Sequence, residues 1–166
     1  MEKDHYIGVD ISKRTIDVAI YVKNQVKKGT FPHETFSNSG DGFKDMKRWL
    51  RKQNAVLSKS LCCMEATGNY TYELCLFLEQ LGIAYSIQSP LHLKRSFGLT
   101  HGKNDKVDAS RIAYYAYLHR EDIKLSKLAS ESVRKLKSLI AERKSLIAEI
   151  ARCKAQLKEA GENAPS

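Results

Sequence analysis

Residues 5–22 of the chain are HYIGVDISKRTIDVAIYV, and this stretch predicts two neighbouring strands joined by a tight turn. Apolar residues alternate with other residues over His5–Ile11 and again over Thr15–Val22, which is the two-residue period of a strand. The Ser-Lys-Arg between them is short enough for a hairpin turn. Because both segments are strongly apolar, we expect the hairpin at the middle of a sheet.

Helical and extended patterns alternate in the chain after the hairpin. A loop at residues 37–40 precedes the first predicted helix, and Gly82 ends the second one. The order of elements predicts an α/β domain with a mixed sheet covered by helices. The predicted elements are a strand at Thr30–Phe36, a helix from Phe43 to Gln53, a strand at Ser60–Glu65, a helix at Tyr70–Leu81, a strand at Ile83–Ile87 and a basic helical segment at Leu91–Phe97.

A further helix is predicted within Lys103–Leu118, KNDKVDASRIAYYAYL. Asn104 is a good N-cap, and apolar residues follow it at helical spacing. Asp105 and Asp108 are three positions apart, so both carboxylates point the same way from the first turn. Acids in a first turn also offset the helix dipole, and most such pairs do nothing else.

The pattern changes from about Ser130 to a long amphipathic helix. Arg143 breaks an otherwise apolar seam of three-four spacing, which comprises Leu136, Leu139, Leu146, Ile150, Cys153 and Leu157. Both a coiled coil and a helix packed on its own domain fit this spacing, and we favour an intermolecular or interdomain helix. We therefore predict two parts, a metal-binding domain at 1–125 and a linking, coiled-coil-like helix at 126–166.

The composition is that of a globular protein, and its basic charge is compatible with a polyanionic partner. The net charge is +9 and the sequence pI is near 9.4, which suits DNA or RNA but also fits an anionic membrane surface or simple solubility. The four cysteines lack zinc-ligand spacing, so we expect reduced thiols in the cytoplasm. No apolar run reaches the roughly 20 residues that span a bilayer, and we expect neither a signal peptide nor a membrane partner.

Four carboxylates occupy positions where α/β proteins gather ligands. Asp10 lies on the first strand beside Gly8, Glu65 ends a later strand, and Asp105 and Asp108 open a helix. Carboxylates drawn together repel one another, and Mg²⁺ or Mn²⁺ would remove that cost. The alternative is that the acids bind no metal: Asp10 would be a turn former at a strand end, Glu65 a surface acid, and the Asp105/Asp108 pair a helix cap. A fifth acid, Asp17, is assigned to a strand face or turn.

Three segments resemble the DEDD-type insertion-sequence transposases, a family that includes pilin-gene invertases. They are GVDISKRTIDVAIY, EATGNYTYELCLFLEQLGI and KNDKVDASRIAYYAYL, and the likeness extends over most of residues 5–120. The resemblance implies an RNase H-like, RuvC-like fold, in which Asp10, Glu65, Asp105 and Asp108 form the catalytic tetrad that binds Mg²⁺. The family usually has Thr where this chain has Asn104, and both residues cap helices.

The resemblance also implies DNA strand cleavage and exchange, as in transposition or site-specific recombination. Family members continue into a second domain with a serine nucleophile and use a guide RNA to choose their DNA. The serines near the end of this chain match no such motif. We therefore expect an N-terminal part of a recombinase that is not competent alone.

Basic residues near the tetrad are candidates for holding phosphates, because Lys and Arg neutralise backbone charge without reading sequence. For each of them the alternative is a solvated surface charge. Tyr70 could line the cleft and Thr67 could orient Glu65. The predicted nucleic-acid-binding residues are Lys94, Arg95, Lys103, Lys106 and Arg111, with His92 as a further candidate.

Three other functions remain open on the sequence. A Holliday-junction-type nuclease shares the fold and would be active without a second domain. A non-catalytic nucleic-acid-binding and dimerisation module would bind without metal and tolerate Asp10→Ala. A sugar-kinase-like ATPase could also use a GVDIS hairpin to cradle phosphates, but a second ATPase lobe is missing from the sequence.

Overall fold

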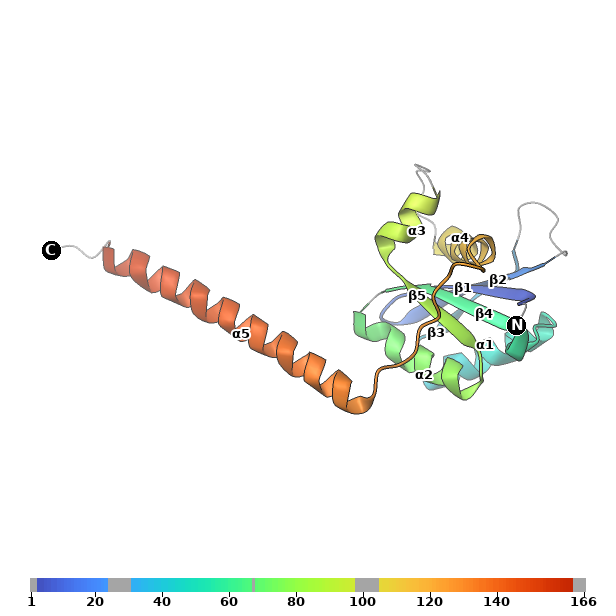
Figure 1. Ribbon diagram of the computed structural model, residues 1–166, viewed down its shortest axis with the longest axis horizontal. Coiled ribbons are helices and arrows are strands. Elements are labelled where there is room, and N and C mark those ends of the chain that lie inside the picture. The colour runs from blue at the N-terminus through green and yellow to red at the C-terminus, as the bar shows by residue number, and fades with distance from the viewer. Residues whose placement is uncertain (1–2, 24–30, 67, 98–104, 163–166) are drawn as a thin grey trace. The chain divides into compact units, whose positions relative to one another are not determined.

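The computed structural model describes residues 3–23, 31–66, 68–97 and 105–162, and it divides the chain into two compact units. Unit 1 is Met1–Leu128 and unit 2 is Ala129–Ser166. Unit 1 is built on a mixed sheet, which in the described residues has the strand order β3-β2-β1-β4-β5 (Figure 1). The strands are β1 (His5–Ile11), β2 (Thr15–Val22), β3 (His33–Ser37), β4 (Ser60–Glu65) and β5 (Ala84–Gln88).

The predicted hairpin forms and supplies the middle of the sheet. β1 pairs antiparallel with β2 and parallel with β4, so it has a neighbour on each side. In the turn, the Ser12 hydroxyl oxygen accepts a hydrogen bond from the Thr15 backbone N–H at 3.0 Å. β3 and β5 extend the sheet, antiparallel to β2 and parallel to β4. The predicted mixed sheet is therefore confirmed.

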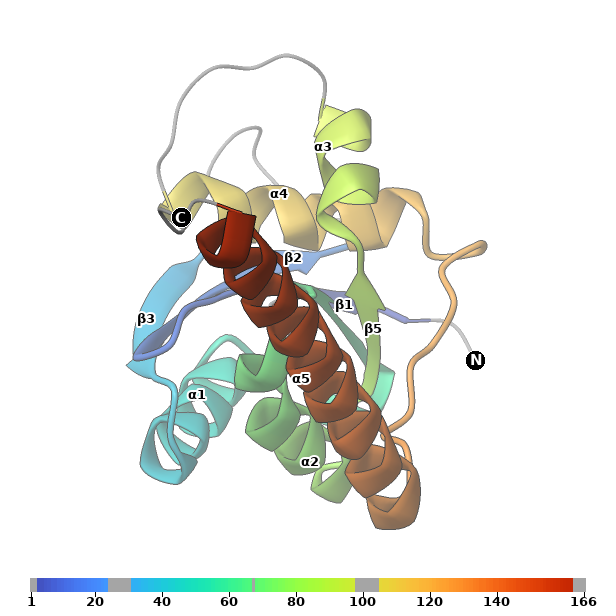
Figure 2. The same cartoon turned by 90° about the vertical axis from the view of Figure 1, so that its left-hand side faces the viewer.

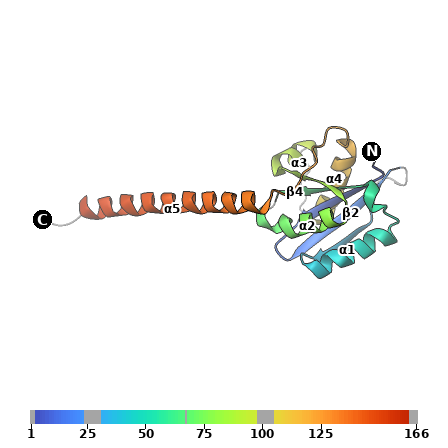
Figure 3. The same ribbon diagram turned by 60° about the horizontal axis from the view of Figure 1, so that its bottom comes forward.

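Helices cover both faces of the sheet (Figures 1 and 2). One face packs against α1 (Gly40–Lys52) and α2 (Tyr72–Gln80), and Figure 3 brings this side forward. The other face packs against α4 (Asp105–Leu118). The first core contains Val9, Val18, Met46, Leu50 and Leu78, and the second contains Tyr6, Leu61, Cys63, Ile112 and Tyr115.

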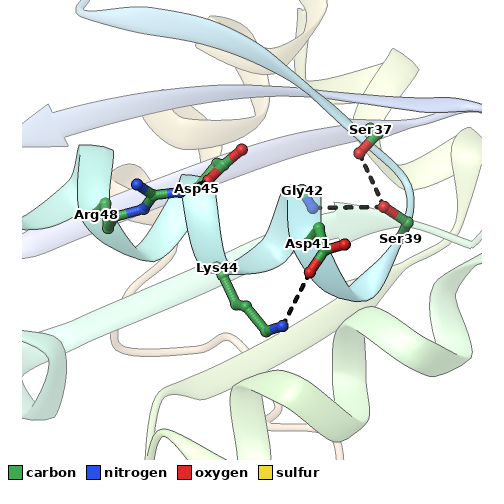
Figure 4. A network of polar contacts seen from close by, with 7 residues as sticks. All are labelled: Ser37, Ser39, Asp41, Gly42, Lys44, Asp45 and Arg48. Carbon is green, nitrogen blue, oxygen red and sulfur yellow. Dashed lines mark hydrogen bonds and ion pairs between the residues drawn. The ribbon is translucent and has the colours of Figure 1, made fainter.

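α1 begins at a cap that the sequence places there. The Ser39 hydroxyl accepts a hydrogen bond from the Gly42 backbone N–H at 3.4 Å, which satisfies one of the free donors of the first turn (Figure 4). Asp41 pairs with Lys44 at 2.8 Å, and Asp45 pairs with Arg48 one turn later. The helix then ends at Lys52, next to the predicted Gln53.

The remaining predicted helices and strands of unit 1 are present, most of them with somewhat different ends. The helix predicted at Tyr70–Leu81 is a 3-10 turn, η2 (Gly68–Thr71), followed by α2, and Gly82 has the positive φ of 66° that ends helices. A second 3-10 turn, η1 (Leu57–Lys59), leads into β4, and α3 (Pro90–Phe97) follows β5.

Residues 123–128 after α4 form an extended segment along the free edge of β5, which we call the strap. Ser126 N–H donates to the Tyr85 carbonyl at 2.8 Å, and Ser86 Oγ donates to the Lys124 carbonyl at 2.7 Å. The Glu79 carboxylate accepts from both the Leu128 N–H and the Tyr85 hydroxyl, at 2.9 and 2.7 Å. The strap therefore covers an edge strand that would otherwise present unpaired backbone groups.

Unit 2 is a single long helix, α5 (Glu131–Glu162), in its described residues. Ser130 caps it, because the Ser130 hydroxyl accepts from the Val133 N–H at 3.4 Å. The predicted apolar seam faces solvent within unit 2, with Leu139 62% and Leu157 73% exposed. No helix in the described part of the chain is long and apolar enough to cross a membrane.

Candidate active site

A row of polar residues crosses the sheet on the face that α4 covers. Its order follows from the strand pairing: Thr35 pairs with Asp17, Asp17 with Asp10, and Glu65 with Gln88. Asp10 and Glu65 directly follow Val9 and Met64, the last pair of the parallel ladder between β1 and β4. The two carboxylates predicted on different strands are therefore neighbours at the carboxyl ends of adjacent parallel strands, where α/β sheets bind ligands.

The residues two positions away along each strand show on which face of the sheet this row of polar side chains lies. Such residues point to the same side of a sheet. Gly8 lies against α4, Ala19 clusters with Ala109 and Ala113, and Cys63 packs with Ile112. Asp10, Asp17 and Glu65 therefore belong to the α4 side, and all three side chains are half-buried.

Gly8 brings the first turns of α4 down onto β1. A Cβ added at Gly8 would lie 2.1 Å from the Ala109 carbonyl oxygen and 2.2 Å from the Ala113 nitrogen. The space that a side chain at this position would take is occupied by the backbone of α4. The contact sets Asp108, the residue before Ala109, close to the strand that carries Asp10.

Asp108 is half-buried and has a cationic partner. Arg111 Nη1 lies 3.4 Å from Asp108 Oδ1, one turn along α4. Arg111 was predicted to bind phosphate, and the structure shows it beside a predicted ligand carboxylate. Arg95 is exposed on α3. Lys103 lies outside the described residues, as do the side chains of Lys94, Asp105 and Lys106, so the structure leaves these predictions open.

The described residues fit a hard divalent cation by their chemistry. Asp10, Glu65 and Asp108 offer only carboxylate oxygens, the donors that Mg²⁺ and Mn²⁺ prefer. Among the side chains that the structure describes, no three acidic, histidine or cysteine groups are close enough to form a metal cluster. Asp10, Glu65 and Asp108 therefore do not form a three-ligand metal site by themselves in this structure, and the side chain of the fourth predicted acid, Asp105, lies outside the described residues.

The cysteines lie outside this chemistry. Cys62, Cys63 and Cys75 are buried free thiols, and burial raises the pKa of Cys63 to about 12 and that of Cys75 to about 11. Such thiols stay protonated near neutral pH, so they are poor nucleophiles and poor metal ligands.

Gln88 ends the row at β5 and is held on two sides. Its Nε2 donates to Ser86 Oγ at 2.7 Å, and the Tyr115 hydroxyl of α4 donates to its Oε1 at 3.4 Å. Burial raises the pKa of Tyr115, which keeps this hydroxyl a donor. A cavity of about 500 Å³ lies beyond Gln88, lined in part by His92, His119 and Asp122.

Two further sequence candidates have simple positions. Tyr70 lies on η2 and is 46% exposed, and its carbonyl accepts from Asn38 Nδ2 at 3.3 Å. Thr67, proposed to orient Glu65, lies outside the described residues. The sequence reasoning missed Thr35 and Gln88. Gln88 could have been found as a polar residue ending an apolar strand, the signal that identified Glu65.

The chain matches the sequence model of the IS110-type DEDD transposases, described as transposase, over residues 7–160. It is 31% identical over 141 residues to the pilin gene-inverting proteins of Moraxella bovis and Moraxella lacunata. These alignments cover 83% of the chain but 41% of each relative, so the chain spans less than half their length.

Two solved structures of Thermus thermophilus RuvC are similar to this chain, and the fold assignment is drawn from the second. The first has a TM-score of 0.49 at 12% identity, and the second, in complex with a Holliday junction substrate, has 0.51 at 10% identity. Each likeness covers 74% of this chain and 99% of the RuvC chain. The predicted RuvC-like, RNase H-like fold is therefore confirmed.

Proposed function

Because the chain belongs to the IS110-type DEDD transposases, we propose that unit 1 is the metal-dependent part of a DNA recombinase. In this proposal Asp10, Glu65, Asp105 and Asp108 hold Mg²⁺ or Mn²⁺ for DNA strand cleavage and exchange. The observation that supports it most is the placement of Asp10 and Glu65 side by side, with the start of α4 over β1.

The chemistry of this site divides between the cation and the chain. A bound pair of divalent cations supplies Lewis-acid stabilisation of the attacking and leaving oxygens of a phosphodiester. The carboxylates hold that charge in place, and the contact of α4 with Gly8 fixes Asp108 relative to β1. Arg111, beside Asp108, limits the repulsion among the acids and is available to a phosphate oxygen.

DNA is the proposed substrate, and an RNA guide is a proposed partner. The net charge of +9 supports polyanion binding. Lys94, Arg95, Lys103, Lys106 and Arg111 are the proposed phosphate contacts. Recombination by the whole protein would further require the serine domain that the family resemblance implies, and we propose that the isolated chain binds metal and nucleic acid without completing strand exchange.

Calorimetric titration with Mn²⁺ and with Mg²⁺ tests the metal site directly. The parent chain should bind saturably, and Asp105→Ala/Asp108→Ala should weaken binding at least ~10-fold, since two oxygen ligands are lost. The matched control is Asp41→Ala/Asp45→Ala, which removes two acids from the start of α1 on the opposite face (Figure 4). Equal titrations of the parent and the Asp105/Asp108 variant would contradict the proposal.

A structure-specific nuclease is the second candidate. The chain covers nearly all of the RuvC chains it resembles, so it contains a whole domain of that fold. A junction nuclease would cleave a four-way DNA junction with this chain alone and lose that cleavage in Asp10→Asn. Binding without cleavage would favour the recombinase part, and metal-independent binding that survives Asp10→Asn would favour a binding module.

We also propose that α5 joins copies of the chain. Seven large apolar residues of this helix are 44–73% exposed within its own unit, including Leu139, Leu146 and Leu157. Their three-four spacing is that of a coiled-coil seam, and a second copy offers the same seam.

A further inference from the structure

Asp17 stands next to Asp10 in the sheet. The two aspartates are paired residues of the antiparallel strands β1 and β2. Paired side chains point to the same face, with Cβ atoms about 4.5–5.5 Å apart. Ala19, two positions from Asp17, packs against Ala109 and Ala113, so Asp17 also lies on the face that α4 covers.

The carboxylate of Asp17 has a fixed orientation. The Thr35 hydroxyl donates a hydrogen bond to Asp17 Oδ1, and Thr35 is the paired residue of Asp17 on β3. This bond occupies one oxygen from the side away from Asp10. Thr35 is therefore an anchor on β3 that leaves the second oxygen of Asp17 for other partners.

Two carboxylates directly opposite each other on neighbouring strands destabilise a sheet. This repulsion between the two carboxylates is offset when both lie close to one cation, because each is attracted to the positive charge. Asp17 thus adds negative charge at the position where the proposed site already has Asp10 and Glu65.

We propose that Asp17, anchored by Thr35, is a positioning residue of the metal site. It raises the affinity of Asp10 and its fellow carboxylates for a divalent cation by adding charge beside Asp10, and Thr35 keeps that charge in place. The inference rests on the proposed function, because it assigns a further residue to the same site.

Calorimetric Mn²⁺ titration of Asp17→Asn, Thr35→Val and the parent chain tests the role. Asparagine keeps the shape and the acceptor for Thr35 but removes the charge, so the Kd should rise about 10-fold, as for partners just outside a ligand shell. Thr35→Val keeps the charge and releases its anchor, so the rise should be smaller, about 2- to 3-fold. The matched control is Asp45→Asn on α1, which removes one charge on the opposite face and should leave the Kd unchanged.

Thermal unfolding without metal separates this role from a structural one. If Asp17 repels Asp10, then Asp17→Asn should unfold at the same or a higher temperature than the parent while binding Mn²⁺ more weakly. A lower unfolding temperature with an unchanged Kd would mean that Asp17 only supports the hairpin, and would overturn the inference.

The two proposals fail in different ways. A parent-like Kd in Asp17→Asn, together with loss of binding in Asp10→Asn, overturns the role of Asp17 and leaves the metal site standing. If the parent itself shows no saturable Mn²⁺ binding, both the site and the role of Asp17 are wrong.

Discussion

At Gly8 the backbone of α4 lies so close to β1 that the position needs a residue without a side chain. Both atoms within 2.2 Å of an added Cβ belong to the backbone of α4. Backbone atoms of a helix cannot turn aside as a flexible side chain can. A methyl group at position 8 would therefore lift α4 from the sheet, together with Asp108.

We expect Gly8→Ala to lower the free energy of unfolding by about 3 kcal/mol or more, since overpacking of a tight core costs about 1–3 kcal/mol and backbone atoms give way least. Gly40→Ala is the matched control, because an added Cβ there has no neighbour within 4 Å. Urea unfolding of both variants measures the difference. Similar unfolding midpoints would show that α4 can shift on β1 without cost.

Single residues of the site were predictable only where their own sequence context carried a signal. Asp10 and Glu65 end apolar strands, and Asp105 and Asp108 open a helix, so each could be singled out. The place of Asp17 beside Asp10 depends on the register of β1 against β2. Register is a property of two paired segments, and a one-residue slip would turn every side chain to the other face.

The strap is the element that ties the end of unit 1 to the sheet. Glu79 of α2 holds it, because its carboxylate accepts hydrogen bonds from the Leu128 N–H and the Tyr85 hydroxyl. These two donors, the Leu128 N–H first, hold the pKa of Glu79 below its ordinary value of 4.5. Leu128 also packs on the core beneath α2.

We expect Glu79→Gln to be less stable than the parent at neutral pH and to approach it in acid. A lowered pKa in the folded state gives stability that is present above the unfolded value of 4.5. That stability is lost as the pH falls through the lower folded pKa, where the carboxylate takes up a proton. Urea unfolding at about pH 7 and about pH 3 measures the difference between the two proteins.

Glu73→Gln, in the exposed first turn of α2, is the control for this experiment. It should differ little from the parent at either pH. An equal gap between Glu79→Gln and the parent at both pH values would show that charge on Glu79 does not hold the strap.

Elements with a strong period were predicted, and elements held by partner contacts were not. The hairpin, α1 and α5 show clear two-residue or helical periods. The third strand was predicted to begin at Thr30, which lies outside the described residues, and in the structure it begins at His33. Pro32 comes just before it. The Pro32 carbonyl accepts a hydrogen bond from the Ile20 N–H at 3.0 Å, but proline has no N–H to donate to the sheet. The strap has no period, since backbone contacts with β5 and Glu79 define it.

At the scale of the whole molecule, the two units differ in how much of their apolar surface they bury. Unit 1 buries its apolar residues between the sheet and its helices, whereas α5 leaves its apolar seam exposed within unit 2. Exposed apolar stripes of this length mark interaction surfaces. The mixed fold was predictable from the order of the elements. The packing partner of α5 was not, because the same three-four spacing of apolar residues fits a helix that packs against a second copy and a helix that packs against its own domain.

We expect the chain to self-associate through α5, and Leu139→Glu/Leu146→Glu to weaken association by about two orders of magnitude. Each buried leucine contributes about 1.5–3 kcal/mol, and a buried glutamate adds a penalty. Ser138→Glu/Ser145→Glu introduces the same charges one residue earlier and should leave association largely intact. Sedimentation velocity measures the oligomeric state, and a monomeric parent at all concentrations would refute the role of α5.

The strap also determines how a mechanical load would travel through the protein. Ala129 is the first residue of unit 2, and the hydrogen bonds of Ser126 and Leu128 lie immediately before it. Tension applied to α5 would therefore reach unit 1 first at Glu79 of α2, through Leu128, and then at β5, through Ser126. α4 lies further back along the chain than these contacts, so they would take up load before it reaches the helix over the acids.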